Sequence, residues 1–295
     1  AMAIEIRQIG PCFAGEVEGL DMTKPLSSDD ADAIHAGMDE YAVLTIREQP
    51  MTPEQQMAFT LSLGEIEPAS RASLRDESDY RLPSTFQDVS NLDKDNKPME
   101  RYDRRRLFAI GNRLWHSDSS FKKIPAKYSL LHAISIPSKG GDTEFADMRA
   151  AYDALDEETK QEVEGLVCEH SQIFSRQQCG FFDLTEEERE RFAPARQTLV
   201  RTHPVTGRKS LYLASHAGGI IDWPVPEARL FLRDLIEHAT QRQFVYPHKW
   251  RVGDLVIWDN RQVMHRARSF PVDEPRDMRR TTLAGDGPTV ADQAA

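Results

Sequence analysis

The sequence has no hydrophobic run of the length that a bilayer requires, and it has few cysteines. None of the apolar stretches in its 295 residues approaches the roughly 18 residues of a membrane-spanning helix. No apolar stretch follows the N-terminus, so we expect neither a membrane anchor nor a signal peptide. The three cysteines, Cys12, Cys168 and Cys179, form no C-x-x-C pair and cannot all pair with one another. These features predict reduced thiols and a cytoplasmic protein.

Positive charge is also scarce. Lysine and arginine number 37 against 48 acidic residues, which gives a net charge of −11, whereas a nucleic-acid-binding protein usually presents a basic face. The segment from Arg261 to Arg280 is an exception, with six arginines and three acidic residues. A basic segment in an acidic protein favours a small anionic ligand over a polyanion. We therefore expect a small-molecule anionic substrate and no nucleic-acid partner.

Several catalytic signatures are missing. The sequence contains no G-x-S-x-G, no G-x-x-x-x-G-K-[ST], no H-E-x-x-H and no G-x-G-x-x-G. These absences argue against a nucleophile elbow, a P-loop, a zinc-protease helix and a dinucleotide-binding turn.

The elements that the sequence does predict are short strands interrupted by helices. Strands are expected at 15–22, 43–48, 128–137, 142–148, 209–215 and 254–260, the last of which leads straight into 261–267. Helices are expected at 27–42, 52–64, 185–192 and 226–241, with two more within 148–167 that separate near Asp156. Strands and helices do not alternate regularly, which argues against a doubly wound sheet. The pattern favours one mainly β domain, 1–295, built as a sandwich or jelly roll with flanking helices.

Residues from about 65 to 106 are polar and have no clear periodicity. A span of this length without secondary structure is unusual in a compact domain unless it is a functional lid or a disordered segment. We predict a lid-like loop here.

The stretch WHSDSSF, residues 115–121, places a histidine and a carboxylate two positions apart. In a strand, residues i and i+2 point to the same face, so His116 and Asp118 would converge as two ligands of a metal do. The pair alone is weak, because 9 histidines and 48 acidic residues give about 1.5 such triplets by chance. The alternative is that both side chains lie at the surface in water and bind no metal, and other parts of the sequence are needed to decide between the two.

His265 is the best candidate for a third ligand, because it directly follows a strongly buried strand in WDNRQVMHR. Two histidines and one carboxylate on one face of an iron leave three positions open, as in non-haem Fe(II) oxygenases. Such an enzyme also needs a co-substrate that supplies electrons. In a strand, Arg276 and Arg280 would share a face while Arg279 points away, and an arginine can grip a carboxylate through two parallel hydrogen bonds.

The sequence at this point resembles a known family. The residues that carry the resemblance are His116, Asp118, Thr143, His265, Arg276 and Arg280, within the runs LWHSDSSF, GGDTEFADMRAAYDAL, LVRTHPVTGRKSLYL, EHATQRQFVY and GDLVIWDNRQVMHR. They are similar to the Fe(II)/2-oxoglutarate-dependent dioxygenases of the taurine dioxygenase group, and the similarity extends from about Gly15 to Arg280. Within the group the sequence is most similar to members that oxidise the herbicide 2,4-dichlorophenoxyacetate (2,4-D).

The resemblance implies a role for each matching residue. His116, Asp118 and His265 would bind Fe(II), Thr143 and Arg276 would bind the distal carboxylate of 2-oxoglutarate, and Asn112 would line the co-substrate and substrate pocket. Ser119 and Arg280 would contact the substrate, with a structural ion pair as the alternative for Arg280. His203 and His216 would also face the substrate, with a buried core histidine as the alternative for each. It further implies a double-stranded β-helix, a homo-oligomer, and a reaction in which 2-oxoglutarate and O2 yield succinate and CO2 while the substrate is hydroxylated. For an aryloxyalkanoate such as 2,4-D, the products would be a phenol and glyoxylate.

The identity of the substrate is open at this stage. The resemblance weakens between about residues 67 and 103, where the walls for an aromatic ring would have to lie, and Leu82 and Phe86 are among the few apolar candidates there. Taurine or another alkylsulfonate is the alternative substrate. A jelly-roll binding protein that has lost turnover is a further alternative, and the intact set of ligands and Arg276 counts against it.

Overall fold

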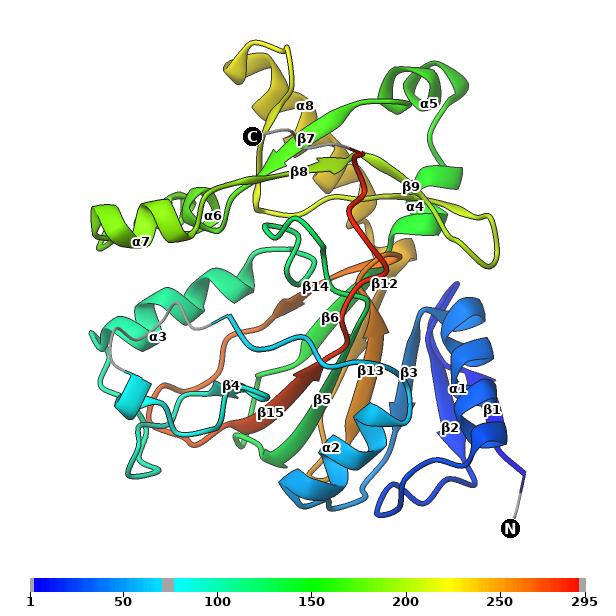
Figure 1. Cartoon of the computed structure of the whole chain (residues 1–295), viewed down its shortest axis with the longest axis vertical. Coiled ribbons are helices and arrows are strands. Elements are labelled where there is room, and N and C mark those ends of the chain that lie inside the picture. The colour runs from blue at the N-terminus through cyan, green and yellow to red at the C-terminus, as the bar shows by residue number, and fades with distance from the viewer. Residues whose placement is uncertain (1–2, 71–76, 292–295) are drawn as a thin grey trace.

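Two β-sheets face each other in the computed structural model, which describes residues 3–70 and 77–291 (Figure 1). The large sheet has the order β1-β2-β3-β13-β5-β15-β4 and the small sheet has the order β12-β6-β14. The large sheet comprises β1 (Glu5–Gln8), β2 (Gly15–Glu18), β3 (Val43–Ile46), β13 (Leu255–Asp259), β5 (Tyr128–Ser135), β15 (Asp277–Thr282) and β4 (Gln87–Ser90), and the small sheet comprises β12 (Val245–His248), β6 (Thr143–Asp147) and β14 (Val263–Ala267). Within the two sheets, every pairing is antiparallel except that of β2 with β3.

Two helices cover the outer face of the large sheet. α1 (Ser28–Tyr41) and α2 (Pro53–Leu61) place Ile34 and Phe59 in a core with Leu130 and Ile257 from the sheet. Both helices begin where the sequence predicts, because Ser27 and Thr52 accept hydrogen bonds from the backbone of Asp30 and Gln55.

The inner face of the large sheet packs against the small sheet. Leu131 and Trp258 point inward from β5 and β13, and Phe145 and Val263 meet them from β6 and β14. β13 reads as a continuous apolar run because both of its faces are buried.

A third group of elements lies at one end of this sandwich, at the top of Figure 1. It contains a sheet in the order β11-β7-β8 and the pair β10-β9. Its elements are β7 (Val167–His170), β8 (Ala195–Thr198), β9 (Val200–Thr202), β10 (Lys209–Leu211), β11 (Ala217–Ile220), α4 (Met148–Asp153), α5 (Glu157–Val163), α6 (Gln172–Gln178), α7 (Glu186–Arg191), α8 (Val225–Ala239) and η3 (Arg242–Phe244). The core of this group continues into the small sheet through Met264.

The segment 65–106 contains more regular structure than its sequence pattern predicts. β4 pairs with the edge of the large sheet at β15, η1 (Glu77–Asp79) precedes it, and α3 (Arg104–Ala109) begins at the end of the segment. β4 reads QDVS and is half-buried throughout, so it lacks the alternation that identifies a strand in sequence. Residues 71–76 lie outside the described part of the chain, and a lid function for the segment stays a prediction.

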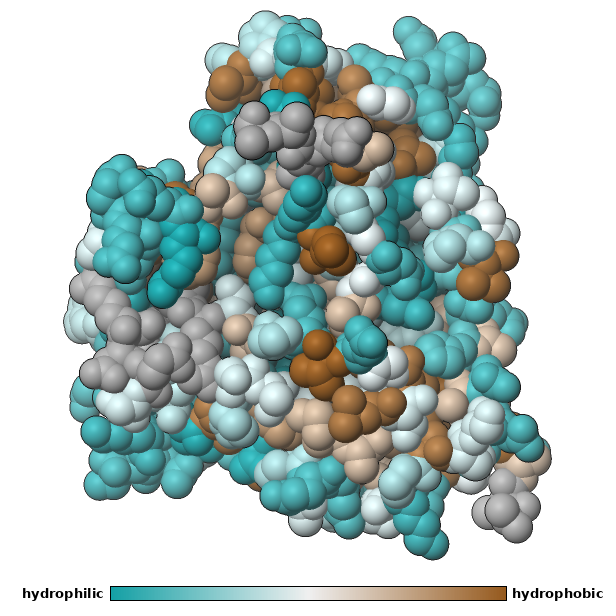
Figure 2. Space-filling model, viewed as in Figure 1, coloured by the Kyte–Doolittle hydropathy of each residue, from teal (hydrophilic) through white to brown (hydrophobic). Residues whose placement is uncertain are grey.

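One face of the molecule shows how its exposed hydrophobic residues are distributed. On the face drawn in Figure 2, hydrophobic residues form small separate groups among hydrophilic ones. None of the described helices combines the length and the hydropathy needed to cross a bilayer.

Candidate active site

A cavity opens between the two sheets. Leu131 and Trp258 line it from the large sheet, and Thr143, His265 and Ala267 line it from the small sheet. Residues of α3, of η2 (Ile110–Arg113), of α6 and of the segments 67–70 and 79–99 also line it. The three predicted metal ligands, His116, Asp118 and His265, all line this cavity.

The backbone brings His116 and His265 together. The two residues form an isolated antiparallel bridge in which each backbone N–H donates to the carbonyl of the other, at 3.0 and 2.9 Å. Asp118 then lies in a turn, and Ser119 follows it with a left-handed φ of 58°. The strand alternation considered for WHSDSSF therefore does not extend beyond His116. His116 and Asp118 converge because a turn brings the aspartate back toward the bridge.

The three side chains form one compact cluster. Their ligand atoms all lie within 4.8 Å of one another, and all three residues are buried. Asp118 Oδ1 is 3.7 Å from the Nε2 atoms of both His116 and His265. The donor set of two imidazoles and one carboxylate fits a single divalent metal with open positions.

The tautomer of His116 is fixed by its backbone. His116 Nδ1 donates to the carbonyl of Leu114 at 2.7 Å, so the Nε2 lone pair points at the cluster. Burial lowers the pKa of His116, and burial with the nearby His116 lowers the pKa of His265 to about 3. Both rings are consequently neutral near pH 7, which is the form that binds a metal.

A hydrogen-bond network orients Asp118. Ser129 donates to its Oδ2 at 2.7 Å, Arg280 donates to its Oδ1 at 2.9 Å, and its backbone N–H donates to Asn260 at 3.0 Å. Burial opposes ionisation of Asp118, but Arg280 and the two neighbouring histidines hold the pKa of its carboxyl well below its usual range. The carboxylate is therefore charged and aimed before any ligand arrives.

Arg276 and Thr143 form a second polar corner of the cavity. Arg276 is 4% exposed, its Nη2 donates to the carbonyl of Gly141 at 3.1 Å, and its Nε has no partner among the described residues. The hydroxyl oxygen of Thr143 accepts from Trp250 Nε1 at 3.0 Å, which leaves its proton available to donate. Burial lowers the pKa of Arg276 to about 10, so it remains a cation at neutral pH.

The geometry of β15 places Arg276 and Arg280 on one face. Both line the cavity, whereas Arg279 is not among its described lining residues. The register shift between β15 and β5 puts the extra residue, Ile134, in β5, so the alternation along β15 is undisturbed. The predicted sharing of a face is confirmed, but Arg280 is already paired with Asp118.

The remaining predicted residues divide into two groups. Asn112, Ser119 and His216 line the cavity. Ser119 donates to Glu67 at 2.7 Å, and His216 Nδ1 is 2.9 Å from the hydroxyl of Ser175. Sequence reasoning missed Glu67 and Arg176, which also line the cavity, because neither belongs to a recognisable motif.

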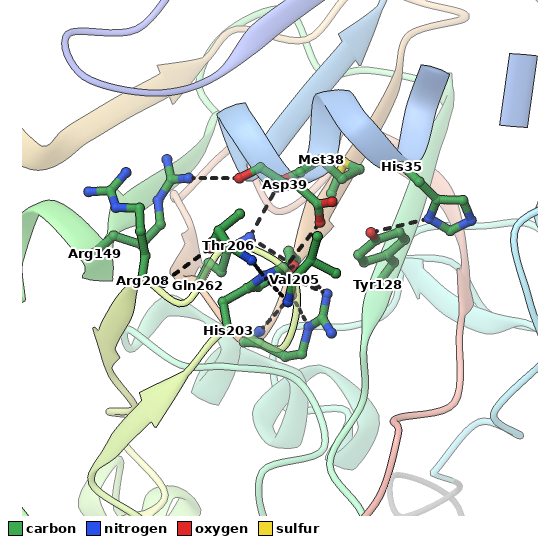
Figure 3. Close-up of polar contacts among 12 residues, drawn as sticks. His35, Met38, Asp39, Tyr128, Arg149, His203, Val205, Thr206, Arg208 and Gln262 are labelled. Carbon is green, nitrogen blue, oxygen red and sulfur yellow. Dashed lines mark hydrogen bonds and ion pairs between the residues drawn. The ribbon is translucent and has the colours of Figure 1, made fainter. Parts of the chain in front are cut away.

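His203 is not among the described residues that line the cavity. Figure 3 shows it beneath α1, in a cluster with Asp39, Val205 and Thr206. Its Nδ1 accepts from the backbone of Val205 at 3.2 Å and Thr206 at 3.1 Å, and its Nε2 is 3.5 Å from Asp39 and 3.6 Å from Asp259. The substrate role predicted for His203 is corrected by this placement to a structural role, since its ring shapes the turn after β9.

We expect His203→Ala to affect stability and not substrate recognition. The substitution leaves two backbone N–H groups without their acceptor, which should lower the free energy of unfolding by about 1–3 kcal/mol. Denaturant titration and steady-state kinetics measure the two effects separately. A raised KM for the substrate with unchanged stability would restore the predicted substrate role.

Apolar side chains form another part of the cavity wall, which we call the apolar wall. Leu82 and Phe86 both line it, as expected for the loop that contains them, and Phe108, Phe121 and Leu131 add to this wall. The cavity thus combines a ligand cluster, buried cations and a surface for a flat apolar group.

Comparison with known proteins decides the family. Residues 5–282 match the model of the family described as "Taurine catabolism dioxygenase TauD, TfdA family". The chain belongs to this family. The predicted family, jelly-roll fold class and dioxygenase class are thereby confirmed.

Three individual proteins show which members of the family this chain is similar to. The chain is 42% identical to the alpha-ketoglutarate-dependent 2,4-dichlorophenoxyacetate dioxygenase of Cupriavidus pinatubonensis, over 97% of this chain and 99% of that one. It is 35% identical to the (S)-phenoxypropionate/alpha-ketoglutarate-dioxygenase of Sphingobium herbicidovorans, over 96% of each. The crystal structure of AAD-2 in complex with Mn(II) and N-oxalylglycine superposes with a TM-score of 0.95 at 58% identity, covering 98% of this chain and 100% of that one. These relatives confirm the expected dependence on a metal and 2-oxoglutarate.

Proposed function

We propose that this protein is an Fe(II)- and 2-oxoglutarate-dependent dioxygenase that hydroxylates an aryloxyalkanoate such as 2,4-D. One observation carries the proposal: the His116–Asp118–His265 cluster, buried arginines and aromatic side chains all line the same cavity. The relatives named for 2,4-D and phenoxypropionate, similar over nearly their whole length, support the substrate class.

The ligand cluster would hold the iron through His116 Nε2, His265 Nε2 and Asp118 Oδ1. When bound, iron supplies the oxidising chemistry, in which O2, 2-oxoglutarate and substrate are converted to succinate, CO2 and hydroxylated substrate. The protein contributes ligands that are already oriented, because His116 is fixed by Leu114 and Asp118 by Ser129 and Arg280.

The corner at Arg276 and Thr143 would hold the distal carboxylate of 2-oxoglutarate. A buried guanidinium with a free Nε and a hydroxyl with a free proton supply donors that match a carboxylate. Gly141 gives the guanidinium its space, because a Cβ at this position would lie 3.2 Å from Arg276 Nε. Asn112, which also lines the cavity, would face both the co-substrate and the substrate.

We expect Thr143→Val to raise the 2-oxoglutarate requirement and Thr143→Ser to leave it nearly unchanged. Valine keeps the shape of threonine but loses the hydroxyl, and a hydrogen bond to a charged group contributes about 1.5–3 kcal/mol. The KM for 2-oxoglutarate should therefore rise by about 10- to 150-fold in the valine variant. Equal values in both variants would show that the hydroxyl does not contact the co-substrate.

The substrate chemistry follows from where hydroxylation occurs. In an aryloxyacetate, the carbon next to the carboxylate also bears the ether oxygen, which weakens its C–H bonds. Hydroxylation at this carbon gives a hemiacetal, which collapses to a phenol and glyoxylate. The aromatic ring would lie against Leu82, Phe86 and Phe108, which line the cavity.

The test is a product assay. Iron-loaded protein is incubated with 2-oxoglutarate, O2 and either 2,4-D or taurine, and phenol and sulfite are measured. Phenol from 2,4-D without sulfite from taurine supports the proposal. Sulfite without phenol would replace it with the alkylsulfonate alternative, and neither product would contradict both.

We further propose that the protein acts in the cytoplasm, as a homo-oligomer and without a nucleic-acid partner. Its three cysteines are free thiols, as a reducing compartment favours. The net charge of −11 supports the absence of nucleic-acid binding. Sedimentation of the purified protein measures the oligomeric state.

A further inference from the structure

The cavity contains two deeply buried arginines that have no carboxylate partner. Arg176 and Arg276 are each 4% exposed, and neither forms an ion pair with a described acidic residue. The other cavity arginines are matched: Arg81 pairs with Asp88 and Asp277, Arg105 pairs with Asp103, and Arg280 pairs with Asp118. A buried cation without a counter-ion is costly, so both positions are suited to an anionic ligand.

The surroundings of Arg176 keep its guanidinium in place without neutralising it. Its Nη2 donates to Asn112 Oδ1 at 3.0 Å, its carbon Cζ lies 4.6 Å from the centre of the Phe108 ring, and its Nε has no partner among the described residues. Gly111 makes room for it, since a Cβ there would lie 2.5 Å from Arg176 Nη1. The guanidinium is thus held between a turn and an aromatic ring, with donor capacity left over.

The position of Arg176 relative to the ligand cluster is also informative. Ser175, the residue before Arg176, has its hydroxyl 2.9 Å from His216 Nδ1. The ring centres of His216 and His116 are 5.9 Å apart, and Arg176 lines the same cavity as both histidines. Phe108, which it contacts, belongs to the apolar wall of the cavity. A molecule that joins a carboxylate to an aromatic ring could therefore contact both residues while its intervening carbon faces the cluster.

We infer that Arg176, with Asn112 beside it, is the principal anchor for the carboxylate of the organic substrate. This inference rests on the proposed function, and it assigns the two unmatched arginines to the two anions that the reaction brings together. Arg276 takes the co-substrate and Arg176 takes the substrate. Arg280, whose Nη1 is 2.9 Å from Asp118 Oδ1, then serves mainly to orient and neutralise the iron ligand.

The experiment compares the binding affinities of two ligands of nearly the same shape, one charged and one neutral. Protein loaded with Mn(II) and 2-oxoglutarate is titrated calorimetrically, without O2, with 2,4-D and with its primary amide. The titrations use the wild type, Arg176→Gln and, as a matched control from the same cavity, Arg280→Gln. A guanidinium that pairs with the carboxylate recognises the acid and not the amide.

We expect Arg176→Gln to weaken binding of 2,4-D by about 30-fold to several thousand-fold, as for loss of one partner of a buried charge pair. Binding of the amide and of 2-oxoglutarate should change by less than about threefold, and Arg280→Gln should keep the preference for the acid. The melting temperature of ligand-free Arg176→Gln should be no lower than that of the wild type, because the residue removed is an unmatched buried cation. Arg176→Lys, which keeps the charge but not the fork, should lose an intermediate amount.

Several results would overturn the inference. One is an unchanged preference for the acid in Arg176→Gln, and another is equal weakening of acid and amide together with a lower melting temperature, which indicates a purely structural role. Loss of the preference in Arg280→Gln alone would move the anchor to Arg280. In all three cases the wild type still binds 2,4-D, so the proposed function stands; a wild type that binds neither ligand contradicts the proposed function itself.

Discussion

Asp118→Ala should abolish both metal retention and turnover. Asp118 supplies the only carboxylate of the ligand cluster in the described part of the chain, and its Oδ1 is 3.7 Å from both histidine Nε2 atoms. Alanine removes the one negative ligand and leaves the Arg280 guanidinium, previously paired with Asp118, next to the two histidines. Metal content after dialysis against excess Fe(II) or Mn(II), together with succinate formation, measures the outcome.

A matched control separates this effect from general loss of structure. Asp88→Ala removes a carboxylate that also lines the cavity and also pairs with an arginine, Arg81, but that lies outside the ligand cluster. This control should retain one metal per chain. Stoichiometric metal in Asp118→Ala, or equal loss of metal in the two variants, would refute the assignment of the site.

Arg276→Ala should raise the 2-oxoglutarate requirement by about 30-fold to several thousand-fold. Truncating one partner of a buried, hydrogen-bonded charge pair costs about 2–5 kcal/mol, and each 1.4 kcal/mol is a factor of about ten in affinity. Arg276 combines deep burial with an Nε that has no partner among the described residues, and its Nη2 donates to the carbonyl of Gly141, two residues before Thr143 on the facing sheet. The dissociation constant of 2-oxoglutarate from the Mn(II)-loaded protein measures the effect.

Arg279→Ala is the control for this prediction. Arg279 lies on the same strand, but it points to the opposite face and is not among the described residues of the cavity. We expect its removal to change 2-oxoglutarate binding by less than about threefold. If the affinity for 2-oxoglutarate is unchanged in Arg276→Ala and falls in Arg279→Ala, the anchor is Arg279 on the opposite face of β15, and the prediction is contradicted.

Local patterns in the sequence predict those parts of the fold and site that local chemistry determines. The helix starts at Ser27 and Thr52 follow from capping, and the common face of Arg276 and Arg280 follows from strand alternation. The bridge between His116 and His265 links residues far apart in the chain, so no spacing predicts it; the buried strand before His265 indicates that residue as a candidate, and the resemblance supplies its role.

The remaining features depend on tertiary contacts that no short pattern encodes. Arg176 lies on a short helix whose sequence, QIFSRQQ, gives no sign that its arginine is buried against Phe108. The resemblance alone gives His203 a substrate role, yet its Nδ1 accepts two backbone hydrogen bonds of the turn that it begins. Asp118 reaches the cluster through a turn with a left-handed φ at Ser119, and not through strand alternation.

The ratio of succinate to phenol tests the central claim most directly. Iron-loaded protein is given 2-oxoglutarate, O2 and 2,4-D, and succinate and 2,4-dichlorophenol are quantified over the same time course, with Asp118→Ala as the blank. A coupled dioxygenase with this substrate should form the two products in a ratio close to one, and the variant should form neither. Succinate that accumulates at the same rate with and without 2,4-D, with no phenol, would contradict the account.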